Sequence, residues 1–146
     1  MLFVYTIAFH QGVRIHFVSA PSGYYNIRFS VLTVVVKIGT SSLTYDNGKM
    51  NYRRIEKLVR VLSDLKNQGK KVVLVSSGAI GMGVGKLGLL KRPNDIPTKQ
   101  AAAAVGQCEL MYTYDKLFSE YHHTVAQILL TGSDFQHEDR HRNFRN

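Results

Sequence analysis

The sequence predicts an α/β fold built on a mainly parallel sheet with helices on its faces. Short, continuous apolar runs alternate with segments of helical periodicity, in the order strand, helix, strand, helices, strand. Such unbroken apolar runs are typical of strands buried on both faces. With 146 residues, 45% of them hydrophobic and 20% charged, the chain is long enough for one domain with a core.

The first predicted strand, Val31 to Ile38, is β-branched, is interrupted only by Lys37 and ends at Gly39. Asn51 is a good N-cap for the helix that follows. The apolar residues of this helix recur at helical spacing and are Ile55, Leu58, Val59, Leu62 and Leu65. Gly69 stands where a helix-ending glycine belongs.

The second predicted strand covers residues 71–76, and Ser77 is placed to cap the next helix. A long, alanine-rich helix is expected from Thr98 to about Tyr121. The third strand is Val125 to Leu130. A charged helical segment is expected to begin at Asp134.

Three loops follow the strands, namely 39–42, 76–79 and 131–134. Ligands of parallel sheets bind at the carboxyl ends of the strands. Residues 78–80 would offer free backbone N–H groups at a helix N-terminus, which suits a carboxylate or a phosphate. The alternative, equally open at this point, is that Ser77 only caps its own helix.

Lys37 is unusual because a lysine in a buried strand is costly unless it meets an anion. Its position two residues before Gly39 favours a phosphate-binding role. The alternative is a lysine on an edge strand that reaches solvent.

The glycines of residues 83–88 match the dinucleotide fingerprint G-x-G-x-x-G, but their context is wrong. Gly83 lies seven positions after Ser76, whereas the fingerprint directly follows its strand. A phosphate-binding P-loop fails as well, because Ile80 and Leu87 stand where it needs Gly and Ser or Thr. We therefore interpret these glycines as packing positions and a helix exit.

The formal net charge of +9 could attract nucleic acid or anionic metabolites. The basic residues are scattered, with no basic run interleaved with aromatics, so we expect a solvated basic surface and no nucleic-acid partner. The single cysteine, Cys108, excludes an internal disulfide and suits a reducing compartment such as the cytoplasm. We expect Cys108 to lie in the core and not to act as a nucleophile.

Residues 1–33 differ from the rest, being rich in aromatics and histidine. The apolar segment from Leu2 to Phe9 is too short to span a membrane. We therefore do not expect the protein to associate with a membrane. A signal peptide with cleavage after Ala20 is the weaker alternative, because no basic segment precedes it. We expect a poorly ordered extension.

Four segments in order, VVVKIGTSSLT, VVLVSSGAIGMG, KQAAAAVGQCELM and VAQILLTGSD, resemble the glutamate 5-kinases of the amino acid kinase family. The resemblance runs from about Val34 to Asn146 and leaves residues 1–33 outside. It implies a three-layer α/β/α sandwich with a mainly parallel sheet.

The resemblance also implies a reaction, the transfer of the γ-phosphoryl group of ATP, with Mg²⁺, to the side-chain carboxylate of L-glutamate. The product, γ-glutamyl phosphate, begins proline biosynthesis. The ATP-phosphate contacts implied by position are Lys37, which is also the catalytic candidate, Gly39 and Thr40. The implied glutamate-binding residues are Ser77, Gly78 and Ala79. No protein ligand to the metal is implied, and family members are expected to be cytoplasmic homo-oligomers.

The sequence departs from the family pattern in one large respect. It stops at Asn146, about halfway through the kinase domain, so the later Asn/Asp glutamate loop and the half that binds the nucleotide base have no counterpart. Gly132 also replaces a residue that is often charged. We expect a fragment that is inactive alone and that self-associates through an exposed sheet edge.

Three alternatives stay open. The chain could be the kinase portion of a fused pyrroline-5-carboxylate synthase. It could be a non-catalytic module that binds an amino acid. A small basic nucleic-acid-binding protein is the most distant of the three.

Overall fold

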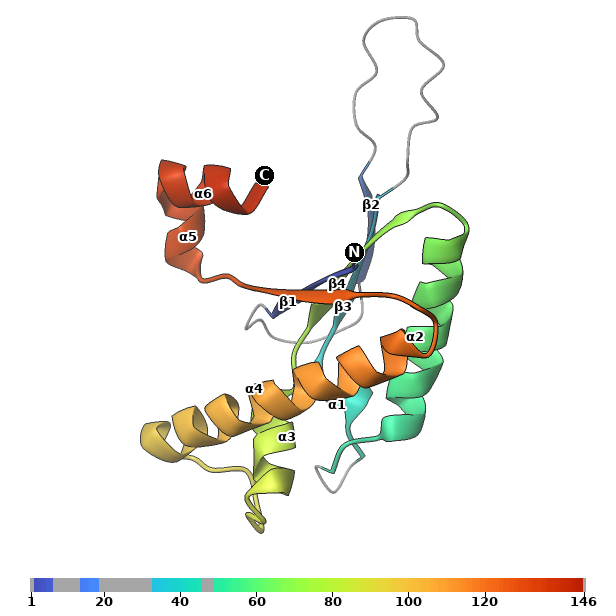
Figure 1. Ribbon diagram of the computed structural model, residues 1–146. Helices are drawn as coiled ribbons and strands as arrows, with labels where there is room; N and C mark the ends of the chain where they lie inside the picture. The colour runs from blue at the N-terminus through green and yellow to red at the C-terminus, as the bar shows by residue number, and fades with distance from the viewer. Residues whose placement is uncertain (1, 7–13, 19–32, 46–48, 146) are drawn as a thin grey trace, which may run out of the picture.

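The computed structural model describes residues 2–6, 14–18, 33–45 and 49–145, and these form one sheet with helices beside it (Figure 1). The strands are β1 (Leu2–Thr6), β2 (Arg14–Val18), β3 (Thr33–Ile38), β4 (Lys71–Ser76) and β5 (Val125–Leu129). Their order in the described sheet is β2-β3-β4-β1-β5. Only the pairing of β2 with β3 is antiparallel within it, so the mainly parallel α/β fold is confirmed.

The described helices are α1 (Thr40–Leu43), α2 (Tyr52–Asn67), α3 (Ala79–Lys86), α4 (Ile96–Ser119), α5 (Gly132–Gln136) and α6 (Glu138–Arg145). The connection from β3 to β4 runs through α1 and α2, and that from β4 to β5 runs through α3 and α4. Helical crossovers of this kind are what parallel strands of one sheet require, and β3 and β4 are direct neighbours whereas β4 and β5 have β1 between them.

Local capping chemistry fixes where the two long helices begin. The side chain of Asn51 accepts a hydrogen bond from the Arg54 N–H at 3.1 Å, which confirms the predicted cap of α2. The expected start of α4 at Thr98 is wrong by two residues. Asp95 is the actual cap, accepting from the Thr98 N–H at 2.8 Å, and Pro97 is tolerated in the first turn.

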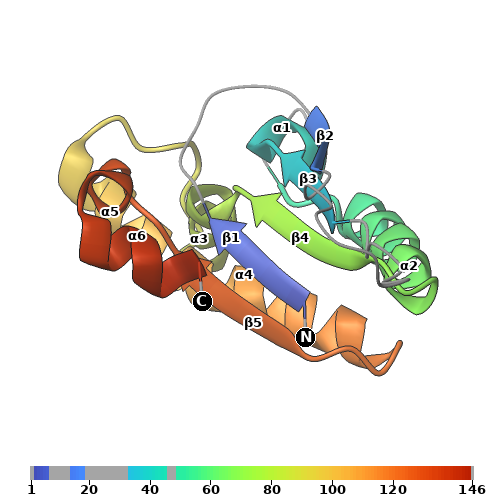
Figure 2. The same cartoon turned by 90° about the horizontal axis from the view of Figure 1, so that it is seen from above.

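The core lies on one face of the sheet, between the strands and the two long helices. The buried strand residues are Val34, Val36, Ile38, Val72 and Leu74. They pack with Ile55, Val59 and Leu62 of α2 and with Leu110, Tyr114 and Phe118 of α4. Figure 2 shows α4 on one side of β1, β4 and β5. Both long helices therefore cover the same face.

The opposite face of β3 and β4 is partly exposed, at positions such as Val35, Val73 and Val75. The expectation that both strands are fully buried was wrong for this face. The second helical layer of the three-layer sandwich stays a prediction.

Cys108 and the N-terminal residues both differ from what the sequence predicted. Cys108 is exposed and not in the core, because the buried residues of α4 that flank it, Gly106 and Leu110, lie on the other side of the helix. No strand was expected before Val31, whereas the structure has β1 and β2 there. The remaining N-terminal residues, 7–13 and 19–32, lie outside the described part of the chain.

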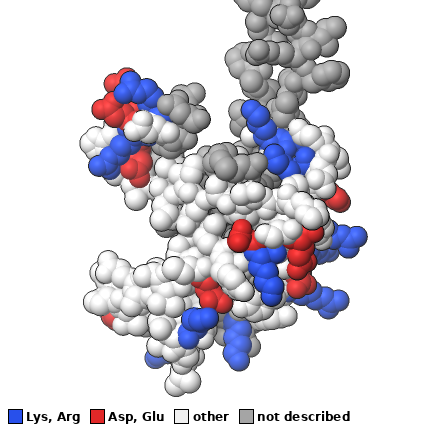
Figure 3. All heavy atoms as spheres, viewed as in Figure 1, with Lys and Arg blue, Asp and Glu red and all other residues white. Residues whose placement is uncertain are grey.

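Charged side chains are interspersed on the face shown in Figure 3, where lysine and arginine lie among aspartate and glutamate. Each of the three described ion pairs joins one basic to one acidic residue at the surface. On this face the described basic residues do not form a continuous patch.

Candidate functional site

The loops that follow β3 and β4 meet at the carboxyl end of the sheet. The hydroxyl oxygens of Thr40 and Ser77 lie 3.2 Å apart. The backbone N–H and the hydroxyl of Ser77 both donate to the Ile38 carbonyl, each at 3.1 Å. Three hydrogen bonds therefore fix the loop after β4 to the end of β3 and to the loop that follows it. They bring Ser77, a predicted glutamate-binding residue, next to Thr40, a predicted phosphate-binding residue.

The expectation that Ser77 caps α3 is wrong. The N-cap residue is Gly78, with φ of +121°, and no side chain caps this helix. A side chain at this φ would be strained, so the turn requires glycine. Because the Ser77 hydroxyl faces the β3 loop, the N–H groups of residues 79–81 keep their capacity to bind an anion at the positive end of the helix.

A buried hydrogen-bond chain supports this turn from below. The Tyr114 hydroxyl lies 2.7 Å from the Ser76 hydroxyl, which donates in turn to the Ser77 carbonyl at 3.1 Å. Burial of the phenol raises the pKa of Tyr114 to about 12, although its hydrogen bond to Ser76 opposes this shift. Tyr114 positions the β4 loop through Ser76.

Sequence reasoning missed Tyr114. The available signal was its spacing from Leu110 and Phe118, four residues away on each side, which puts it on the core face of α4. A buried tyrosine hydroxyl needs a partner, and a serine at the end of a buried strand can supply one.

Lys37 is the next-to-last residue of β3, and its side chain lies on the partly exposed face of the sheet. It pairs in register with Val75 of β4 and with Arg14 of β2. Since β3 lies between two strands, the alternative of an edge-strand lysine is wrong. The position allows the ammonium group to reach a ligand above the carboxyl end of the sheet without being buried.

The loop after β5 is not brought to Ser77. Because β1 lies between β4 and β5, the two loops are separated by two strand spacings, about 9.6 Å. The Asp134 carboxylate also has partners already, namely the N–H and hydroxyl of Thr131 at 2.7 and 2.6 Å and the Arg140 guanidinium at 3.3 Å. The Thr131 hydroxyl lowers the pKa of Asp134.

Close packing of α3 against α4 holds the β4 loop in place. A β-carbon at Gly83 would overlap the Ala102 carbonyl, and one at Gly106 would overlap the Ala79 carbonyl. Gly88, with φ of +66°, ends the helical segment. The interpretation of Gly83 as a packing position and Gly88 as a helix exit is confirmed, but a packing role is wrong for Gly85, where a β-carbon would meet nothing within 4 Å.

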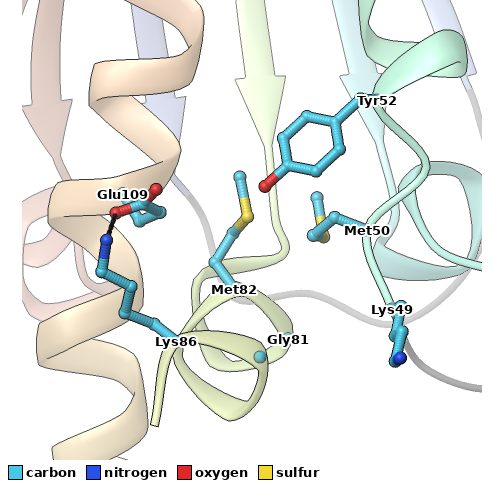
Figure 4. Close-up of a pocket in the computed structure, with 8 residues that line it drawn as sticks. Lys49, Met50, Tyr52, Gly81, Met82, Lys86 and Glu109 are labelled. Atoms are coloured by element: carbon cyan, nitrogen blue, oxygen red, sulfur yellow. Dashed lines mark ion pairs between the residues drawn. The ribbon is translucent and has the colours of Figure 1, made fainter. Parts of the chain in front are cut away.

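A cavity of about 350 Å³ lies beside the candidate site, between α3, α4 and the start of α2 (Figure 4). Lys86 and Glu109 form an ion pair on its wall, with 2.9 Å between Nζ and Oε2, and this raises the pKa of Lys86. None of the predicted site residues lines the cavity. It adjoins the site through Gly81, where a β-carbon would lie 3.7 Å from the Thr40 methyl group.

Metal-binding clusters and membrane-spanning helices are both absent from the described residues. No group of three or more His, Cys, Asp or Glu side chains in this part of the chain is arranged to hold a metal ion. Of the helices in the described ranges, none combines the length and apolar character needed to cross a membrane.

Comparison with known proteins gives consistent matches. The model of the amino acid kinase family matches residues 32–146. The glutamate 5-kinase of Clostridium perfringens is 61% identical over 113 residues, which are 77% of this chain and 42% of that protein. That of Clostridium tetani is 59% identical over 116 residues, 80% of this chain and 43% of that protein. The glutamate 5-kinase of Listeria welshimeri is 61% identical over 98 residues, 67% of this chain and 36% of that protein. The chain thus spans about two fifths of the length of these relatives.

Proposed function

Because the chain belongs to the amino acid kinase family, we propose that residues 34–146 form the glutamate-binding part of an ATP-dependent glutamate 5-kinase. The observation that carries this proposal is the contact between Thr40 and Ser77, which joins the loop of the phosphate-binding candidates to the loop of the glutamate-binding candidates. The relatives named glutamate 5-kinase supply the choice of substrate.

The proposed acceptor loop is Ser77, Gly78 and Ala79. A carboxylate of L-glutamate would accept hydrogen bonds from the N–H groups of the first turn of α3, where the helix dipole favours negative charge. The Ser77 hydroxyl, already fixed between Ile38 and Thr40, gives this loop a set position before substrate arrives. Preorganisation of this kind lowers the entropic cost of aligning the acceptor.

The proposed phosphate-binding residues are Lys37, Gly39 and Thr40. In the reaction, a glutamate side-chain oxygen attacks the γ-phosphorus of ATP, and the bond from that phosphorus to the β–γ bridging oxygen breaks, which releases ADP. Charge neutralisation and alignment supply most of the catalysis in such transfers. Lys37 would offset the negative charge between the two anions, while Mg²⁺ enters with ATP.

We further propose that the part of the kinase not spanned here supplies the nucleotide-base site, the second helical layer and the contacts of a homo-oligomer. The partly exposed sheet face at Val35, Val73 and Val75 supports the missing layer, because apolar strand residues stabilise a fold when a helix covers them. The single cysteine and the use of ATP favour the cytoplasm.

A chimeric enzyme tests this function. Residues 34–146 would replace the matched region of the Clostridium perfringens enzyme, and γ-glutamyl phosphate would be trapped with hydroxylamine in the presence of L-glutamate, ATP and Mg²⁺. We expect trapped product from the chimera and none from the isolated chain. A correctly folded chimera without product would contradict the proposal. Robust product from the isolated chain would contradict the proposal that the nucleotide-base site comes from the part of the kinase not spanned here.

A further inference from the structure

The strand β1 occupies a slot between β4 and β5 and is parallel to both. Phe3, Val4 and Tyr5 pair in register with residues 73–75 of β4. On its other side, all five residues of β1 pair with residues 125–129 of β5. A strand paired along both edges is a structural member of the sheet, although it comes from outside the part of the chain that matches the family model.

Contacts other than those of β1 also hold the two walls of the slot. Helix α4 is fixed to β4 by the hydrogen bond between Tyr114 and Ser76, and Val125 at the start of β5 packs partly buried against the core. Without β1, β4 and β5 would face each other across two strand spacings, about 9.6 Å, with their backbone N–H and C=O groups unpaired. A gap of this width accepts one further strand.

The two strands that form the slot belong to the family-matched part of the chain, whereas the strand that fills it does not. The family model matches residues 32–146, which include both walls of the slot but not β1. More than half of each relative described above lies outside its matched region. A kinase of this family therefore has the walls and also has ample chain elsewhere from which to fill the gap.

We propose that the gap between β4 and β5 is a strand-docking groove, which Leu2–Thr6 fills in place of a parallel strand from the part of a glutamate 5-kinase that this chain does not span. The strand β1 is then a plug that competes with that strand. The inference rests on family membership and not on phosphoryl transfer.

The register gives the groove a role in the candidate site. Because Tyr5 pairs with Val75, Thr6 lies level with Ser76 at the carboxyl end of the sheet. A parallel strand in this register therefore ends beside the β4 loop, so the strand that occupies the groove forms part of the surroundings of the candidate site.

A reversible disulfide tests whether β1 fills the groove. Val4 and Gln127 are register partners, so V4C and Q127C in a C108S background place two cysteines on adjacent strands at bonding distance. The matched control pairs V4C with L129C, which lies two residues along β5 and at about 8 Å is too far to bond. We expect a disulfide in the first variant only. Absence of a disulfide with Q127C, or equal formation with L129C, would overturn the proposal.

The same variant tests competition. The probe is a separately produced polypeptide comprising the part of the Clostridium perfringens enzyme outside the matched region, and its affinity is measured by titration. Oxidation locks β1 in the groove, so we expect the oxidised V4C/Q127C chain to bind the probe at least about tenfold more weakly than the reduced chain. The L129C control should not change on oxidation. Equal affinity of the oxidised and reduced V4C/Q127C chains would overturn the proposal, whatever the outcome of the activity assay.

Discussion

The hydroxyl groups of Thr40 and Ser77 lie 3.2 Å apart, although 37 positions separate the two residues in the sequence. Each hydroxyl is in the first few residues after a parallel strand, and β3 and β4 are neighbours in the sheet. The contact therefore makes one site of two loops that come from different parts of the chain.

Removal of either hydroxyl should weaken glutamate binding. In the chimeric enzyme, Ser77→Ala should raise KM for glutamate by about 5- to 10-fold, because the acceptor loop loses the side-chain hydrogen bonds to Ile38 and Thr40 that hold it in position, and a neutral hydrogen bond contributes about 1 kcal/mol. Thr40→Val should have a smaller effect, and the double variant should show a coupling of at least ~0.5 kcal/mol. Ser41→Ala, on the exposed side of α1, is the matched control. Purely additive effects of Thr40→Val and Ser77→Ala would argue against a shared site.

Lys37 should contribute to the reaction with ATP and not to the stability of the fold. Lys37→Met should lower kcat/KM for ATP by roughly 100-fold or more, because a preorganised positive charge is lost. The side chain is partly exposed, so the thermal midpoint should change little. Lys57→Met on the exposed face of α2 removes the same charge away from the site and should leave kinetics unchanged. A comparable loss of kcat/KM for ATP in both variants would mean that Lys37 contributes only through the overall positive charge of the protein.

Glycines 83 and 85 should respond oppositely to alanine. At Gly83 the new methyl group would overlap the Ala102 carbonyl, so we expect a loss of about 2 kcal/mol or more in unfolding free energy. At Gly85 a β-carbon meets nothing within 4 Å, so Gly85→Ala should stabilise the protein by about 0.5–1 kcal/mol. Urea denaturation of both variants measures these changes in unfolding free energy. Loss of ATP binding in a stable Gly85→Ala variant would revive the nucleotide-loop interpretation.

Tyr114 should make stability fall at alkaline pH. Its folded pKa is raised from 10.0 to about 12, so the neutral phenol is favoured in the folded state. This pKa difference contributes about 2–3 kcal/mol to the unfolding free energy. The contribution is fully present below pH 10 and is lost as the pH rises towards 12.

The matched variant for this effect is Tyr114→Phe. It should cost about 1 kcal/mol at pH 8 through the lost hydrogen bond to Ser76. It should also show a shallower decline of stability in urea between pH 10 and 11 than the unmodified chain, because it has no phenol to titrate at this position. Parallel declines in the two proteins would show that the Tyr114 phenol titrates normally.

Local signals in the sequence accounted for most of β3, β4, β5 and α2. Continuous apolar runs predicted the strands to within a residue or two, and Asn51 and Gly69 marked the ends of α2 because capping depends on adjacent residues. The expected start of α4 at Thr98 was two residues late, because the helix includes Pro97 in its first turn, where proline is favourable.

The parts that could not be predicted depend on contacts distant in sequence. Serine is a common N-cap residue, but the Ser77 hydroxyl bonds to Ile38 at the end of β3 and to Thr40 just after it, and these residues come close to Ser77 only in the folded sheet. The hydrogen bond from Tyr114 to Ser76 has the same origin. The place of β1 between β4 and β5 is a question of strand order, which hydrophobic pattern does not specify.

The most direct test of the central claim is to map ligand binding residue by residue on the isotope-labelled chain by NMR. Addition of L-glutamate should shift the backbone amide signals of Ser77, Gly78 and Ala79, and a non-hydrolysable ATP analogue with Mg²⁺ should shift those of Gly39 and Thr40. Saturable shifts at residues 83–88 in place of these, or no saturable shift at either loop, would contradict the account.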